Sequence, residues 1–370
     1  MAVRYLFSIL VFYFFNNELS LNFSDLWYRS NSQRFIDTVQ NGYTAKQFEY
    51  GTFENWDLYP LYPLIIRSTG YFFPLSQSLN HLYIAGIAIS TVFFGLALFM
   101  LDKLLETVWL FDDKKYFVFL LLIVFPGSYF FNLVSAESLF LFLSSASLYF
   151  MFKKKYFLSA FFIGFSIITR SAGFALVIPF LFHFLVGEKY NQEIKKLPKL
   201  STYFVVIFTP VLIFYYHLFE KTGDFFASIK TQTVLHEMKF FPLAFIVDYF
   251  SKYQGRINLD LFLNLILLIF LLTILIYCFI KIYLIFDGRS LEQNSLFIYA
   301  LIYVLMLSSI VSHNMLFRYA SVCLPLYIMS AMVFNFPVRS VRFLSVLFIF
   351  LMLQTLLFTA YLVGVGTYSF

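Results

Sequence analysis

Long apolar segments recur along almost the whole of this 370-residue chain, and they constrain its fold more than any other feature. A helical segment of about 20 apolar residues crosses the roughly 30 Å hydrocarbon core of a bilayer. The chain is 61% hydrophobic with a mean hydropathy of +0.80, which is more apolar surface than a soluble fold of this length can bury. We therefore predict an all-α polytopic membrane protein.

The apolar segments predict a bundle of about 11 transmembrane helices that form a single membrane domain over residues 1–370. The predicted spans are 3–16, 81–101, 115–134, 137–152, 156–169, 171–187, 201–219, 258–280, 294–312, 320–336 and 341–363. Two longer polar stretches interrupt them. The first, 17–80, is expected to contain interfacial helices, and the second is the loop 220–257.

Basic residues are distributed unevenly between the connections of these predicted spans. If every span crosses the membrane and the N-terminus is cytoplasmic, the inner connections carry most lysines, including the triplet at 153–155. The short outer connections then carry only Arg170 and Arg318. Because basic residues in short loops stay on the cytoplasmic side, we expect a cytoplasmic N-terminus and both polar stretches on the outer or lumenal face.

The two arginines on the predicted outer face adjoin apolar segments. A cation at the centre of a membrane helix costs about 2.5–3.5 kcal/mol, so Arg170 and Arg318 each either snorkel to the interface or meet an anionic partner. A guanidinium group binds phosphate through paired N–H donors. Two such groups on one face therefore indicate a lipid-linked phosphate as the ligand.

Carboxylates on the same face supply candidate catalytic bases. Asp37 lies in a helical-looking segment of the first polar stretch, and Asp57 lies in a turn rich in Trp and Pro. If the reaction is the transfer of a sugar from a phosphate, a carboxylate can take the proton of the acceptor hydroxyl. Such general-base catalysis raises the rate about 10²- to 10⁴-fold. Glu137 opens the span 137–152, where it is either a helix-capping acid or a site acid facing the arginines. A solvated carboxylate without a role is the alternative for each loop acid.

Several motifs that define other functions are missing from the sequence. It contains no GxxxxGK[ST], HExxH, CxxC or GxSxG pattern, which leaves ATP-driven transport, zinc hydrolysis and a nucleophile elbow unsupported. The five histidines are scattered without ligand spacing, so we predict no metal site and no cofactor. A net charge of +6 is too modest to indicate nucleic-acid binding.

Short motifs follow one another along the predicted outer face. They are the segment 31–43 with its closing Gly-Tyr, the Leu-Tyr-Pro-Leu-Tyr-Pro run at 58–63, Ser-Ala-Glu-Ser-Leu-Phe at 135–140, Thr-Arg-Ser-Ala-Gly at 169–173, and Phe-Arg-Tyr at 317–319 followed by Pro325. In order and spacing they resemble the motifs of GT-C-type membrane mannosyltransferases, the family related to GPI mannosyltransferase II and its prokaryotic homologues.

This resemblance implies a GT-C-like fold and a glycosyltransferase that moves a hexose, mannose by the resemblance, from a polyprenyl-phosphate donor to a lipid-linked or protein-linked acceptor. Asp57 or Asp37 would be the base, and Glu137 would orient the acceptor or a neighbouring arginine. The expected substrate-binding residues are Asn31, Arg34, Arg170, Ser171, Arg318 and Tyr319. The implied partners are the polyprenyl-phosphate-linked sugar and membrane lipids, with no nucleic acid and with any membrane-protein partner left open. A prokaryotic protein would lie in the plasma (inner) membrane, and a eukaryotic one in the endoplasmic reticulum.

The chain departs from the family pattern in one important place. Where the family has a Trp-Asp pair, this sequence has Ser30-Asn31, and an amide cannot act as a carboxylate base. Either the base has moved to Asp25, Asp37 or Asp57, or catalysis has been lost. A lipid-linked sugar flippase, a catalytically inactive relative and a polymerase or ligase of lipid-linked glycans remain alternative functions.

Overall fold

A computed structural model of the chain describes eleven stretches of its sequence. These are residues 31–51, 54–72, 79–108, 112–187, 193–235, 244, 246–247, 259–281, 290–309, 316–333 and 344–354. All the regular secondary structure in them is helical, as the sequence predicts. In chain order, with η for a 3₁₀ helix, the elements are α2 (Asn31–Asn41), η2 (Asn55–Asp57), α3 (Leu61–Phe72), α4 (Leu79–Thr107), α5 (Asp112–Val124), η3 (Pro126–Asn132), α6 (Glu137–Phe152), α7 (Tyr156–Ile167), η4 (Ser171–Leu176), α8 (Val177–Gly187), α9 (Glu193–Thr222), α10 (Ala227–Leu235), α12 (Leu259–Ile280), α13 (Leu291–Ser308), α14 (Leu316–Ser321) and α15 (Leu324–Val333).

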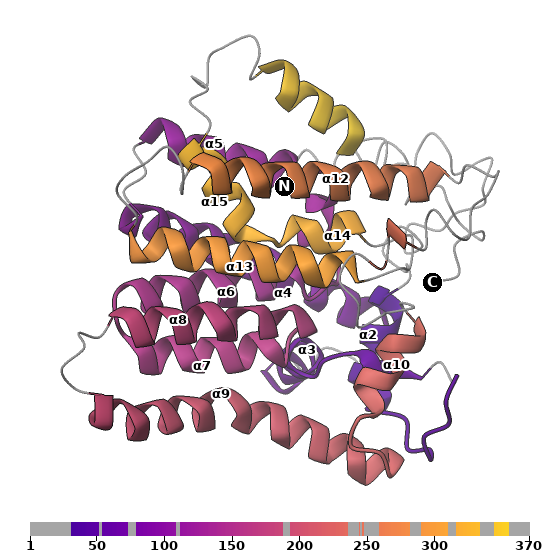
Figure 1. Cartoon of the computed structure of the whole chain (residues 1–370). Helices are drawn as coiled ribbons and strands as arrows, with labels where there is room; N and C mark the ends of the chain where they lie inside the picture. Colours follow the sequence, from indigo (N-terminus) through magenta and orange to yellow (C-terminus); the bar gives the residue numbers. More distant parts are fainter. Residues whose placement is uncertain are drawn as a thin grey trace, which may run out of the picture.

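The long helices run side by side, and α6 lies at the centre of the bundle (Figure 1). It packs against α4 on one side and α7 on the other, and α9 covers the far side of α7. Nearly every residue of α6 is buried, including Ser144, Ser145 and Ser147. Each of these hydroxyls donates to a backbone carbonyl, so small polar side chains let the neighbouring helices approach without leaving a donor unpaired.

Several apolar helices fit a multi-pass membrane protein. Three described helices, His81–Thr107, Pro198–Thr222 and Leu291–Ser308, have the length and hydropathy of membrane spans. The bent pair Lys114–Val124 and Pro126–Asn132 adds a fourth if it is counted as one span. The shorter apolar helices are Glu137–Phe152, Tyr156–Ile167, Ser171–Gly187, Asn264–Ile280 and Leu344–Gln354. The predicted number of about 11 spans is not established, and the predicted span 3–16 lies outside the described residues.

The described part of the polar stretch 17–80 is packed onto one end of the bundle. Its helix α2 buries Phe35 and Ile36, and the Phe35 ring meets Tyr62 of α3 edge to face with centroids 5.2 Å apart. From the second polar stretch, α10 packs against η2 and lies beside α2 at the right-hand end of the bundle in Figure 1. The two stretches that the sequence presents as separate loops therefore meet.

The predicted span 115–134 is broken. Helix α5 ends at Val124, and η3 begins at Pro126 with a bend of 80° between them. Proline lacks the N–H that a continuing helix needs and clashes with the preceding turn, so it starts a new helix here. All residues of η3 are buried, which protects its irregular backbone from lipid.

The backbone of η3 lies directly against that of α14 at Gly127. A Cβ added to Gly127 would overlap the carbonyl oxygen of Phe317, the residue before Arg318. The absence of a side chain at this position therefore sets how closely the turn carrying Arg318 approaches η3.

We expect Gly127→Ala to lower the melting temperature of the detergent-solubilised protein, because a backbone carbonyl cannot swing aside as a side chain can. Overpacking of this kind costs about 1–3 kcal/mol. Gly95→Ala is the matched control, since Gly95 is exposed in α4 and an added Cβ there meets no atom within 4 Å. Equal melting temperatures for the two variants would contradict the close approach of η3 and α14.

Candidate functional site

A fully buried carboxylate joins three segments at one end of the bundle. Glu137, the first residue of α6, is 0% exposed, and its Oε1 accepts hydrogen bonds from Nη1 of Arg170 and Nε of Arg318. Arg170 immediately precedes η4, and Arg318 lies within α14. The two guanidinium groups are buried as well, at 8% and 5% exposure. The start of a helix favours an acid, and here this acid is the counterion of two cations.

Aromatic rings and a hydroxyl fix the orientations of the two arginines. The guanidinium carbon of Arg170 lies 4.7 Å from the ring centroid of Tyr319, and that of Arg318 lies 4.9 Å from the centroid of Phe130. Nη2 of Arg318 also donates to Oγ of Ser135 at 3.3 Å. Cation–π contact and hydrogen bonding thus restrict the positions of both guanidinium groups.

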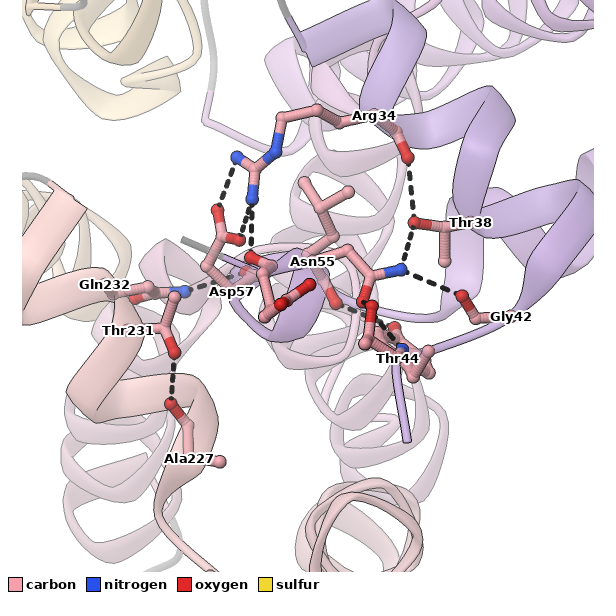
Figure 2. A network of polar contacts seen from close by, with 12 residues as sticks. Arg34, Thr38, Gly42, Thr44, Asn55, Asp57, Ala227, Thr231 and Gln232 are labelled. Carbon is pink, nitrogen blue, oxygen red and sulfur yellow. Dashed lines mark hydrogen bonds and ion pairs between the residues drawn. The ribbon is translucent and has the colours of Figure 1, made fainter. Parts of the chain in front are cut away.

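Asp57 is held by a second, separate ion pair. Nη1 of Arg34 donates to its Oδ2 at 3.1 Å, and Nη2 of Arg34 contacts its Oδ1 (Figure 2). The same Nη2 donates to the carbonyl oxygen of Glu54 at 2.9 Å. From α10, Nε2 of Gln232 donates to the backbone oxygen of Asp57 at 3.1 Å. Arg34 therefore binds the carboxylate in a bidentate manner, while Gln232 secures the backbone behind it.

A half-buried tyrosine, Tyr43, lies close to this pair. Burial and the negative charge of Asp57 together raise the pKa of Tyr43 well above its usual range. The phenol therefore stays protonated and donates to the carbonyl oxygen of Leu58 at 2.7 Å. This bond helps to close the chain around the turn that carries Asp57.

One cavity, with a volume of about 100 Å³, connects the two ion-paired groups. Asp57 with Gln232 lines part of its wall, and Arg170 with Arg318 lines another part. The remaining lining residues are Phe35, Leu58, Tyr59, Ala136, Thr169, Ser171, Ala172, Tyr303, Met306, Leu307 and Tyr319. The cavity thus offers a carboxylate and two guanidinium groups within a mostly apolar enclosure, which is the usual composition of a small-molecule site.

Most of the predicted site residues are brought together. Those at the cavity or bonded to its lining are Arg34, Asp57, Glu137, Arg170, Ser171, Arg318 and Tyr319. Asp37 is not among them, because it lies on the exposed side of α2 and does not line the cavity. Asn31 is the first residue of α2, and its side chain lies outside the described part of the structure.

The sequence interpretation missed two residues. Gln232 lines the cavity from α10, and Asn55 bonds to α2 beside Asp57. Both are polar residues in polar stretches, so neither stands out by composition. Only the Trp- and Pro-rich setting of residues 55–63 marked the neighbourhood of Asn55. Among the described residues, no group of three or more His, Cys, Asp or Glu side chains could hold a metal ion.

The fold and site together fit one class, a multi-pass membrane protein with a cavity lined by charged side chains at one end of a helical bundle. The chain is similar in structure to ArnT from Cupriavidus metallidurans bound to undecaprenyl phosphate, with a TM-score of 0.52 and 14% sequence identity over 94% of this chain and 62% of that one. The apo state of the same protein gives a TM-score of 0.50 and 16% identity over 88% of this chain and 57% of ArnT.

These comparisons show an ArnT-like fold, which agrees with the predicted all-helical architecture, whereas the number of about 11 spans stays a prediction. The chain spans about three fifths of the length of the ArnT chains that it matches. No protein-family model and no curated protein sequence matches it.

We expect Glu137→Ala to lower the free energy of unfolding by about 3–5 kcal/mol, because it leaves two buried guanidinium groups facing each other without their carboxylate. The measurement is the melting temperature in detergent. Glu106→Ala is the control, since Glu106 is exposed, pairs with Lys103 on the surface and should matter little. A Glu137→Ala protein as stable as the Glu106→Ala protein would argue against the shared ion pair.

Proposed function

We propose that this protein is a glycosyltransferase that moves a hexose from a polyprenyl-phosphate donor to a lipid-linked or protein-linked acceptor. The observation that carries the proposal is the cavity that Asp57 lines together with Arg170 and Arg318. The ArnT-like fold supports it, because ArnT has been crystallised with undecaprenyl phosphate bound. The proposed sugar is mannose, on the strength of the motif resemblance alone.

The arginine side of the cavity is the proposed phosphate site. Glu137 carries one negative charge, and a single oxygen of it accepts from both guanidinium groups. Both guanidinium groups are buried, and guanidinium groups in such surroundings bind anions through their N–H donors. Arg170 and Arg318 both line the cavity, where a phosphate would meet their N–H donors.

Asp57 is the proposed general base. It lines the same cavity, whereas Asp37 is exposed outside it, so the structure favours the first of the two predicted carboxylates. In the proposed reaction, Asp57 takes the proton of the acceptor hydroxyl as that oxygen attacks the anomeric carbon. The bond from this carbon to the donor phosphate breaks, and the leaving phosphate stays bound to the arginines.

The location of the site in the cell is also part of the proposal. The distribution of basic residues favours a cytoplasmic N-terminus with the cavity opening toward the outer or lumenal face. A lipid-linked donor would then reach the cavity from within the bilayer. The proposed membrane is the plasma (inner) membrane of a prokaryote or the endoplasmic reticulum of a eukaryote.

A second candidate is a relative that binds the lipid phosphate without turning it over. The specific observation in its favour is that both carboxylate oxygens of Asp57 already accept from Arg34. Catalysis requires at least one of these bonds to loosen before Asp57 can receive a proton. Donor binding by the wild-type protein without sugar transfer would select this candidate.

Transfer from a radiolabelled polyprenyl-phosphate hexose, measured in native membranes that supply the acceptor, tests the proposal. We expect Asp57→Asn to lower turnover by about 10²- to 10⁴-fold with donor binding close to wild type, because only proton transfer is lost. Arg170→Ala should weaken donor binding about 10- to 100-fold, since a hydrogen bond to a charged group contributes about 1.5–3 kcal/mol.

Arg67→Ala is the matched control for the arginine variant, because Arg67 is exposed on α3 and does not line the cavity. It should bind and turn over the donor as the wild type does. Unchanged transfer by both Asp57→Asn and Arg170→Ala would overturn the proposed site.

A further inference from the structure

The short helix that carries Asp57 is attached to α2 at both of its ends. At one end, Asp57 pairs with Arg34, and at the other, Nδ2 of Asn55 donates to Oγ1 of Thr38 at 3.0 Å (Figure 2). Arg34 and Thr38 are four residues apart and therefore lie on one face of α2. The Thr38 hydroxyl also donates to the carbonyl oxygen of Arg34 at 2.8 Å, which closes a ring of bonds between η2 and α2.

Both the nitrogen and the oxygen of the Asn55 side-chain amide form two hydrogen bonds. Nδ2 donates its second hydrogen to the carbonyl oxygen of Gly42 at 2.8 Å, and Oδ1 accepts from the backbone N–H and the hydroxyl of Thr44 at 3.0 and 3.3 Å. Gly42 has a positive φ of 74°, and its N–H donates to the carbonyl oxygen of Thr38 to end α2. Asn55 thus binds the last turn of α2 and the segment that leaves it, using both amide hydrogens and the acceptor capacity of its oxygen.

We propose that Asn55 is the positioning residue that directs the carboxylate of Asp57 into the cavity, an inference that rests on the proposed function for the role of Asp57. Trp56 and the bond from Gln232 keep this three-residue helix on the bundle, and the two attachments on one face of α2 fix how it is rotated there. Asp57 lines the cavity and Asn55 does not, so Asn55 acts through η2 and not on the substrate.

Trp56 makes this role separable from folding. Its side chain is 0% exposed between the two attached residues, and its Nε1 donates to the carbonyl oxygen of Thr44 at 2.9 Å. Burial of this indole keeps η2 on the bundle when the Asn55 amide is removed. We therefore expect an Asn55 variant to fold, but with the Asp57 carboxylate no longer directed into the cavity.

The first experiment needs no substrate. Melting temperatures in detergent are measured for Arg34→Ala, Asn55→Ala and the double variant. If the two attachments fix η2 together, removing either one already lets η2 rotate. The fall in melting temperature of the double variant should then be smaller than the sum of the falls in the two single variants. Losses that add within error would overturn the inference, because they would mean that Asn55 merely satisfies its own loop.

The second experiment separates turnover from binding. Asn55→Ala should lower kcat about 10- to 100-fold with donor affinity unchanged, because the proposed phosphate site stands on other segments. It should have no further effect in an Asp57→Asn background, since Asn55 is proposed to act only through Asp57. Asn41→Ala is the matched control, because Asn41 ends the same helix with an exposed side chain. Wild-type kcat in Asn55→Ala, or equal losses in both backgrounds, would overturn the inference.

A gentler pair of variants covers the case in which Asn55→Ala fails to fold. Thr38→Val removes the hydroxyl that joins Asn55 to Arg34 at nearly constant volume, and Thr38→Ser retains that hydroxyl. We expect the valine variant to lose kcat and the serine variant to recover it, and equal kcat values would overturn the inference. Full activity of Asp57→Asn would instead show that Asp57 is not the base. The melting temperatures would then test by themselves whether Asn55 and Arg34 together fix the orientation of η2.

Discussion

The ion pairs of Glu137 are the interaction on which the site depends. Burying a charge away from water costs several kcal/mol, and three charged groups are buried together here. The ion pairs that Arg170 and Arg318 form with the same carboxylate oxygen offset part of this cost. The two arginines lie 33 and 181 residues from Glu137 in the sequence, so these ion pairs join the start of α6 to η4 and α14. The three segments must therefore pack together before both ion pairs can form.

The site lies where helices stop. Helix α5 gives way to η3 at Pro126, and α7 gives way to η4 just after Arg170. Such breaks bring polar backbone into the bundle, which is tolerated only where protein covers it. A glycine permits close backbone packing at each break. A Cβ at Gly127 in η3 would overlap the backbone of Phe317, and a Cβ at Gly173 in η4 would overlap the backbone nitrogen of Ile167.

Apolar length predicted the middle of the fold well and its breaks poorly. The span 137–152 coincides with α6, because Glu137 at one end and the lysine triplet at the other mark its limits. The span 115–134 proved to be two helices, and the span 320–336 begins in α14 and contains a break at 322–323 before α15, since an apolar 3₁₀ turn or break has the same composition as the helix around it. Arg170, Glu137 and Arg318 were recognised because charge contrasts with an apolar background. Asn55 and Gln232 had no such contrast, and their roles depend on contacts between the two polar stretches.

The two carboxylates of the site have different charged partners, because Glu137 pairs with two arginines and Asp57 with one. This difference supports a placement of donor and acceptor in the proposed reaction. Glu137 pairs with Arg170 and Arg318 and does not itself line the cavity, so the charge on that wall comes from the two guanidinium groups. Asp57 has its own guanidinium in Arg34 and lines the cavity, so its pair is locally neutral. In the proposed reaction, the donor phosphate would bind at the arginine wall and the acceptor hydroxyl would lie beside Asp57. With donor and acceptor on different walls, the hydroxyl would attack the sugar carbon from the side away from the leaving phosphate, which inverts the configuration at that carbon.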